Sequence, residues 1–497
     1  MNPQIYQDLQ KIYPEIAITA AFLITIIADL TAPRIRKIGT FTVTALGLGT
    51  AFFLSLPLFA VPGSTMFFGM VTLDPVAVFF KCFLIFSSLL VLFAAPGARE
   101  FKKVHLGEFY ALLLGITLGM LLLASAADLL MLYLSLEMVS IGSYIMVGYL
   151  RNERESNEAS LKYLLFGAVS TGSMLYGISL LFGLTGTTKV AEIRQFLAGG
   201  GASGDNSMML LVATVLILAG FGFKTASVPF HFWCPDVYAG APTPVTAFLS
   251  VAPKAAGFAA LIRFFFSGLS DAGSTTSPWT PFAAVNWTIL ILLLSVVTMT
   301  FGNIAALRQE NMKRLLAYSS IAHAGYILMG AVVLNAEGIQ AILIYLITYL
   351  FMNLGAFFIV IEVFNQTGSF ELRDYRGLYR RSPFMTIAMS IFMLSLMGIP
   401  PFAGFFGKLF VFAAAVNHNL AWFAVIGALN SVIAVYYYAR VIKTMIIDEG
   451  EDRTRLPLSA VSTALVWLML LPTTGLMLFW DRVQQLTRDS VRLFFGS

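Results

Sequence analysis

Fourteen apolar runs follow one another along the chain, and each is close to the roughly 20 residues that an α-helix needs to cross a bilayer. The chain is 58% hydrophobic and 11% charged, with a mean hydropathy of +0.82. Soluble domains are about one quarter charged. We therefore predict an all-α polytopic membrane protein with about 14 transmembrane helices. The predicted spans are 15–31, 38–60, 72–95, 107–124, 128–149, 159–184, 207–225, 243–266, 282–303, 315–334, 338–364, 384–415, 420–440 and 459–480.

Proline and glycine interrupt the chain at the seventh and twelfth spans. The stretch VPFHFWCPDVYAGAPTPV (228–245) carries four prolines, and GIPPFAGFFGK (398–408) carries a Pro-Pro pair and three glycines. Because proline removes a backbone donor, such breaks persist in lipid only where protein or a water-filled cavity satisfies the freed groups. We predict that helices 7 and 12 are broken.

The basic residues predict the orientation. The loops after odd-numbered spans hold 19 lysines and arginines, whereas the opposite side, termini included, holds 7. By the positive-inside rule, both termini face away from the cytoplasm. This pattern also requires an even number of spans.

Two similar pentapeptides, GFGFK (220–224) and GFFGK (404–408), lie beside the two breaks and five spans apart. An odd offset turns the second copy upside down, and inverted repeats with broken helices are typical of a transport pathway near the midplane. We therefore predict two inverted five-helix repeats. The predicted divisions are 1–106 (helices 1–3), 107–266 (first repeat, helices 4–8), 282–440 (second repeat, helices 9–13) and 459–480 (helix 14).

Five ionisable residues lie within or beside apolar runs: Glu137, Lys162, Lys224, Lys254 and Lys408. A charge at bilayer depth costs several kcal/mol and normally faces a bundle interior or a hydrated cavity. A lysine in a poorly hydrated site can lose and regain a proton near neutral pH, and a nearby carboxylate favours its protonated form. Five such residues on separate segments predict a relay for protons or small cations.

Each of these residues has a simpler interpretation. Glu137 can be a structural carboxylate paired with a lysine, and Lys162, near the start of its helix, can snorkel to the interface. Glu108 opens a span, where an acid also favours the helix dipole. His231 in the first break and His323 in YSSIAHAGYILMG suit a proton shuttle, with a satisfied core histidine as the alternative. Lys81 is expected to snorkel.

Several kinds of chemistry have no motif in the sequence. There is no phosphate-binding P-loop, dinucleotide fingerprint or cysteine ligand set, since Cys82 and Cys234 stand apart. Hence we expect no bound cofactor, no metal and no nucleic-acid partner. The driving energy must come from an ion gradient or from a partner subunit.

With these residues in view, the chain resembles the antiporter-like subunits of respiratory complex I, the proton-pumping NADH:quinone oxidoreductase. The resemblance implies a membrane subunit of a translocase, with fourteen helices, two inverted repeats and a polar axis along the membrane middle. It also implies that Glu137 and Lys224 form a glutamate–lysine pair, that Lys254 is a central connecting lysine and that Lys408 is the terminal lysine. The stretches that carry it are LYLSLEMVSIGSYIMVGY (132–149), EASLKYLLFGA (158–168), GFKTASVPFHFWCPDVYAGAPTPVTAFLS (222–250), KRLLAYSSIAHAGYILMG (313–330) and MGIPPFAGFFGKLFVF (397–412).

Within that family the chain is most similar to the N-type subunit, because the M-type has glutamate where Lys408 stands and the L-type carries an extra lateral helix. The resemblance implies M-type and small K-type subunits as partners, together with lipid. It places NADH (or ferredoxin), FMN, iron–sulfur clusters and quinone in other subunits. It also implies a bacterial inner membrane, or a thylakoid membrane. Two alternatives are a subunit of a multi-subunit sodium/proton antiporter and a structural membrane anchor without a pathway.

Overall fold

The computed structural model describes residues 8–31, 36–102, 104–201, 204–271, 279–450 and 454–492. Within these ranges, thirteen helices are long and apolar enough to cross a membrane. The short apolar helices α16 (Pro383–Met397) and α17 (Ala403–Asn417) form one more span, interrupted in its middle. The bundle thus has the fourteen crossings that the hydropathy predicts.

The first part of the bundle runs from α2 to α11. Its helices are α2 (Tyr13–Thr31), α3 (Arg36–Ser55), α4 (Pro75–Ala94), α5 (Leu106–Ala124), α6 (Leu129–Val147), α7 (Arg154–Thr185), α8 (Val190–Ala198), α9 (Asp205–Thr225), α10 (Trp233–Gly240) and α11 (Thr243–Gly268). The second part comprises α12 (Trp287–Ala306), α13 (Met312–Val332), α14 (Ala336–Thr367), α15 (Leu378–Arg381), α16, α17, α18 (Ala421–Ile446), α19 (Ala460–Gly475) and α20 (Trp480–Arg492). Two antiparallel hairpins, β1 (Ser64–Met66) with β2 (Val71–Leu73) and β3 (Ser270–Asp271) with β4 (Thr280–Pro281), lie in loops.

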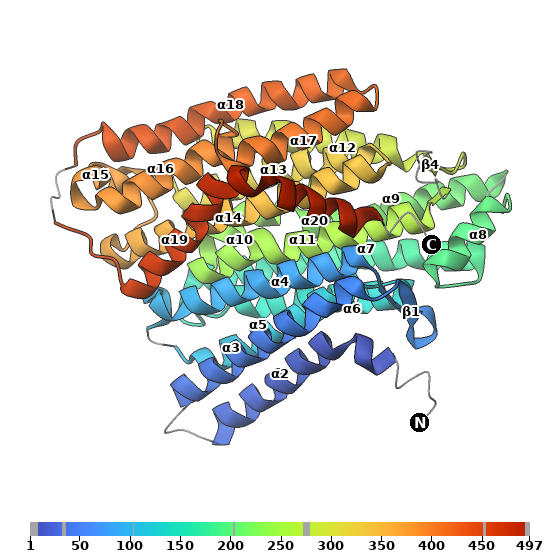
Figure 1. The fold of residues 1–497 in the computed structure, drawn as a ribbon, viewed down its shortest axis with the longest axis horizontal. Helices are drawn as coiled ribbons and strands as arrows, with labels where there is room; N and C mark the ends of the chain where they lie inside the picture. Colours follow the sequence, from blue (N-terminus) through green and yellow to red (C-terminus); the bar gives the residue numbers. More distant parts are fainter. Residues whose placement is uncertain are drawn as a thin grey trace.

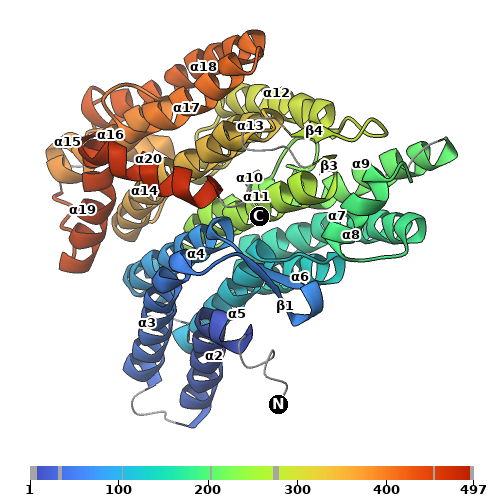
Figure 2. The same cartoon turned by 45° about the vertical axis from the view of Figure 1, so that its right-hand side comes forward.

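The long helices run side by side, with α2 and α3 at one edge of the bundle and α18 at the other (Figures 1 and 2). Between these edges lie α11, whose membrane-spanning window is wholly buried, and the nearly buried α13 and α14. A helix that is apolar on every side must be enclosed by other helices. These three helices therefore form the core to which the remaining ones attach.

The chain continues beyond the last crossing as an amphipathic helix. We predicted a single span over 459–480, but α19 ends at Gly475, and a 3-10 turn, η6 (Leu476–Phe479), leads into α20. The Trp480 ring packs on Phe406 and Phe410 of α17, and the Nε2 group of Gln340 in α14 donates to the Gln484 carbonyl. The start of α2 and the end of α20 lie toward the same side of the bundle (Figure 1).

The two breaks place their lysines differently. Lys224 lies in the last turn of α9, before the break, whereas Lys408 lies in α17, after the break. Ala226 and Gly398 end α9 and α16 in the left-handed region, with φ of 58° and 87°. The two pentapeptides therefore do not occupy equivalent positions relative to the breaks. The similarity of the pentapeptides thus marks both breaks, but it does not show which residues of the two proposed repeats correspond.

Two buried ion pairs join helices that are distant in sequence. Lys81 of α4 was expected to snorkel, but this is wrong: its Nζ atom is fully buried and lies 2.6 Å from Glu15 Oε1 of α2. Asp74, the N-cap of α4, lies 2.7 Å from Arg263 of α11. Once buried, such charges require partners, and these pairs fasten α2 and α11 to α4.

Candidate proton pathway

Lys224 is held between α6 and α11. Its ammonium group donates to Ser140 Oγ of α6 at 3.2 Å, and both residues are buried. Its aliphatic stem passes directly over Gly257 of α11, where an added Cβ atom would lie 3.0 Å from Lys224 Cγ. The absent side chain at Gly257 thus gives the lysine its path into the bundle.

Glu137 is half-buried on α6, three residues before Ser140 and therefore on the same helix face. In the part of the chain that the structure describes, no ion pair within 4 Å joins Glu137 to Lys224. The ammonium group is instead bound to the serine one turn away.

Lys254 lies in the middle of α11 and reaches α13. Its ammonium group is 2.5 Å from Ser320 Oγ, and it lies 5.5 Å from the ring centroid of Tyr238 in α10. Pro253 precedes it inside a helix that continues from Thr243 to Gly268. Lys254 therefore connects the break after α9 to the buried helix α13.

His323 forms the centre of a hydroxyl cluster. Its Nδ1 atom lies 2.7 Å from the Tyr345 hydroxyl of α14, and its Nε2 atom lies 3.2 Å from the Tyr438 hydroxyl of α18. The Tyr438 hydroxyl also lies 2.5 Å from Ser319 Oγ. An imidazole with a hydroxyl on each ring nitrogen can accept a proton on one side and release one on the other.

Lys408 closes the row at the second break. Its ammonium group donates to the Met397 carbonyl at 2.8 Å and lies 4.8 Å from the centroid of the Tyr326 ring. The Met397 carbonyl is left without a helical partner because α16 ends there, and a cation at a helix C-terminus also complements the helix dipole. The break therefore supplies the anchoring group of its own lysine.

A single face of α13 links the two lysines. Ser320, His323 and Tyr326 follow one another at intervals of three residues, so they line one side of the helix. Ser320 touches Lys254, and Tyr326 touches Lys408. The buried polar groups thus form a row from α6 to α17 through the middle of the bundle.

The other predicted residues lie outside this row. Lys162 pairs with Glu158 at 2.9 Å and with Asp236 at 2.7 Å, and it is partly exposed. Glu108 pairs with Arg151 at 3.3 Å between two exposed side chains. His231 is buried against the rings of Phe232 and Phe301, and the centroid of its imidazole lies 4.5 Å from the centroid of each ring. Its Nδ1 atom has no hydrogen-bond partner among the described residues.

The sequence reasoning missed the hydroxyl groups of the row and one buried lysine. Ser140 and Ser320 look like ordinary helix residues, and only their spacing of three residues from Glu137 and His323 would have indicated them. Tyr345 and Tyr438 lie on other helices, α14 and α18, and no pattern in the sequence relates them to His323. Lys313 is one of the 19 lysines and arginines counted in the loops after odd-numbered spans, but it is buried, and its Nζ atom donates to the Ala241 carbonyl at 2.5 Å. The described residues contain no cluster of three or more histidine, cysteine, aspartate or glutamate side chains suited to a metal.

This architecture, a multi-pass helical bundle with two broken helices, is that of an antiporter-like membrane protein. Residues 126–434 match the family described as NADH:quinone oxidoreductase/Mrp antiporter, TM. NADH-quinone oxidoreductase subunit N 2 of Chloroherpeton thalassium is 43% identical over 488 residues, covering 97% of this chain and 94% of that protein. The chain therefore belongs to the NADH:quinone oxidoreductase/Mrp antiporter family, and within it to the group of relatives named subunit N.

Two solved structures share the fold. A chain of respiratory complex I from Thermus thermophilus superposes with a TM-score of 0.78 at 32% identity, covering 95% of this chain and 98% of that one. A chain of the Mrp complex from Dietzia superposes with a TM-score of 0.83 at 19% identity, covering 98% of each chain. The second likeness concerns the fold alone.

Proposed function

We propose that this chain translocates protons as the antiporter-like membrane subunit of an NADH:quinone oxidoreductase. This is the translocase complex to which the names of its relatives refer. The observation that carries the proposal is the row of buried groups from Lys224 to Lys408, with the half-buried Glu137 beside it. Charges at this depth are costly, and a row of them joined through hydroxyls and an imidazole has a use in proton transfer.

In the proposed relay, Lys224, Lys254 and Lys408 hold and release protons in turn. The charge of Glu137 favours the protonated form of Lys224, so a change in that charge sends a proton onward. Lys254 passes it through Ser320 to His323, and the imidazole passes it toward Lys408. Quinone reduction in other subunits supplies the energy.

A polar cavity provides the proposed route of proton uptake. It has a volume of about 910 Å³ and is lined by residues that include Glu100 and Lys313. The Glu100 carboxylate accepts from the Thr243 backbone N–H at 2.8 Å, so the cavity borders the start of α11.

A hydroxyl-bearing face of α11 continues inward from this cavity. Thr243, Thr246 and Ser250 precede Lys254 at helical spacing. Asn353 Nδ2 donates to Ser250 Oγ at 2.6 Å, whereas Asn353 Oδ1 and Thr243 Oγ1 are buried without a hydrogen-bond partner among the described residues. Such atoms are satisfied by water, and water along this face would connect the cavity to Lys254.

The remaining parts of the proposal concern the assembly. The chain belongs to a multi-subunit membrane complex, and we propose M-type and K-type subunits as its neighbours, with FMN, iron–sulfur clusters, quinone and the NADH or ferredoxin site elsewhere. Both termini would face away from the cytoplasm of a bacterial inner membrane. Residues 107–266 and 282–440 would form the two inverted repeats around the relay.

The test is a Lys254→Met variant in the assembled complex. In inverted membrane vesicles with matched complex content, we expect proton uptake and the quinone reduction coupled to it to fall together. If the Lys254→Met complex pumps protons as the wild type does, the chain is a structural membrane anchor without a proton pathway. Sodium transport that is driven by a pH gradient without quinone reduction, and that a protonophore abolishes, would favour the sodium/proton antiporter alternative instead.

A further inference from the structure

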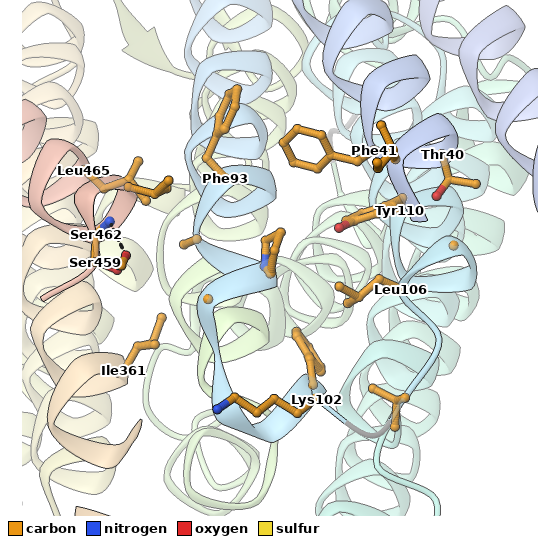
Figure 3. A pocket seen from close by; sticks show the side chains of 18 of the residues that line it. Thr40, Phe41, Phe93, Lys102, Leu106, Tyr110, Ile361, Ser459, Ser462 and Leu465 are labelled. Atoms are coloured by element: carbon orange, nitrogen blue, oxygen red, sulfur yellow. Dashed lines mark hydrogen bonds between the residues drawn. The ribbon is translucent and has the colours of Figure 1, made fainter. Parts of the chain in front are cut away.

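An apolar pocket lies where six helix ends meet, and it shares Lys102 and His105 with the polar cavity of the proposed uptake route. It has a volume of about 760 Å³ and lies between the ends of α2, α4 and α14 and the starts of α3, α5 and α19 (Figure 3). All six ends lie at the same membrane surface, because α3, α5 and α19 leave it and α2, α4 and α14 arrive at it.

The wall of the pocket is built for hydrocarbon. The ring of Phe41 packs edge-on against Phe93 at 5.5 Å and against Tyr110 at 5.9 Å, and Leu465 faces them from α19 (Figure 3). Ile38, Phe93 and Val461, which line the pocket on three different helices, are themselves exposed. Exposed apolar side chains at the ends of membrane spans face lipid, so the pocket is open toward the bilayer.

Two residues of opposite charge line the pocket, and they form no ion pair with each other. Glu362 of α14 is buried and accepts from Ser462 Oγ at 2.6 Å, but no ion pair to it occurs among the described residues. Lys102 lines the same pocket, is exposed, and likewise has no carboxylate within 4 Å in that part of the chain. A buried carboxylate without a cation is unfavourable, which points to a cation that is not part of this chain.

The surroundings of Glu362 are fixed in place. Ser459 Oγ caps α19 by accepting from the Ser462 backbone N–H at 3.0 Å, and it lies 2.8 Å from Ser462 Oγ (Figure 3). One turn after Glu362, Asn365 accepts from the Arg99 N–H at 2.7 Å and donates to the Gly97 carbonyl at 2.9 Å. The loop that carries Lys102 is thus fastened to the helix that carries Glu362.

We propose that this pocket binds one glycerophospholipid with a primary-amine headgroup, of the phosphatidylethanolamine class. Its acyl chains lie against the Phe41, Phe93 and Leu465 wall. Its phosphate pairs with the Lys102 ammonium, and its own ammonium donates to the Glu362 carboxylate. A headgroup with both charges matches the two unpaired groups, whereas an anionic headgroup would leave Glu362 without a cation and a choline headgroup has no N–H to donate.

The test uses the complex purified in detergent and washed until loosely held lipid is gone. Retained phospholipids are extracted and quantified by mass spectrometry, and the washed complex is offered labelled phosphatidylethanolamine, phosphatidylcholine or phosphatidylglycerol. We expect the wild-type complex to retain one more phosphatidylethanolamine than Leu106→Trp, because Leu106 points into the pocket and a larger side chain there fills it (Figure 3). The matched control is Leu161→Trp, on an exposed position of α7 away from the pocket.

The headgroup is tested with Glu362→Gln, which removes the charge and keeps the shape. We expect its affinity for phosphatidylethanolamine to fall roughly tenfold, the effect of losing a charge-assisted hydrogen bond, while binding of phosphatidylcholine is unchanged. Three results would overturn the proposal: equal retention in the wild-type and Leu106→Trp complexes, stronger binding of phosphatidylglycerol than of phosphatidylethanolamine, or cross-linking of a cysteine at Leu106 to a neighbouring subunit that fills the groove.

Discussion

The Lys254 ammonium group lies 2.5 Å from the Ser320 hydroxyl, and Ser320 is one helical turn before His323. This contact joins the lysine in the middle of α11 to the face of α13 that also carries His323. It gives the proposed relay a definite route between its two halves, through a serine.

The Ser320 hydroxyl provides the first prediction. Ser320→Ala should assemble normally and slow pumping roughly tenfold, because a hydrogen bond to a charged group contributes about 1.5–3 kcal/mol. The rate of proton uptake into vesicles at matched complex content measures this. Ser295→Ala is the matched control. The buried Ser295 hydroxyl of α12 donates to the Gly325 carbonyl of α13, the helix that also carries Ser320, and it lies outside the row. Equal effects of both substitutions would reduce Ser320 to a packing role.

Glu137 is predicted to act through its charge. Glu137→Gln should leave assembly intact and sharply reduce pumping, because Lys224 loses the charge that favours its protonated form. Glu137→Asp should be milder, since it keeps the charge but shortens the reach. The control is Glu192→Gln, which removes an exposed carboxylate of α8 that pairs with Lys189. A Glu137→Gln complex that pumps at the wild-type ratio would show that the pairing idea is wrong.

Gly257 is predicted to be needed for the path of Lys224. In Gly257→Ala, the new Cβ atom would lie 3.0 Å from Lys224 Cγ and 3.2 Å from Lys224 Cβ, closer than ordinary contact, so the side chain must shift. We expect stable protein with pumping reduced several-fold, measured at matched complex content. Gly183→Ala in α7 adds the same methyl group where no atom lies within 4 Å and should pump normally. Normal pumping in both variants would count against a fixed position for Lys224.

Lys408 is predicted to require a removable proton. Lys408→Met should impair pumping and the quinone reduction coupled to it. Lys408→Arg should restore the positive charge beside the Met397 carbonyl without restoring transfer, because arginine stays protonated at any relevant pH. Pumping and quinone reduction are measured in parallel for both variants. Full activity of the arginine variant would make Lys408 a structural cation.

The proposed topology can be tested by labelling single cysteines. Cysteines at the exposed positions Asn152 and Gln366 should react only from the cytoplasmic side, and cysteines at the exposed positions Ala198 and Asn417 only from the opposite side. The native Cys82 and Cys234 are half-buried and buried, so their background should be low. Labelling of Ala198 and Gln366 from one side would remove the inverted relation of the two halves. Some basic residues behind this topology, Arg34, Lys103 and Arg453, lie outside the described residues.

Much of the fold was predictable because the signals are local. A run of about 20 apolar residues crosses a bilayer whatever surrounds it, and the prolines around 229–244 and at 400–401 interrupt a helix by their own covalent structure. The same holds for the burial of Lys224, Lys254 and Lys408, because each of these charges stands within an apolar run. These features depend on neighbours in sequence, so the sequence alone determined them.

The tertiary structure decided which groups meet. Lys81 and Lys313 looked like interfacial cations, but Lys81 is buried against Glu15, and Lys313 is buried against the Ala241 carbonyl. The proposed relay depends in the same way on Ser140, Ser320 and the tyrosines around His323, which come from different helices. A hydrogen bond or ion pair forms between atoms within about 3 Å, and this proximity arises only when helices distant in sequence pack together.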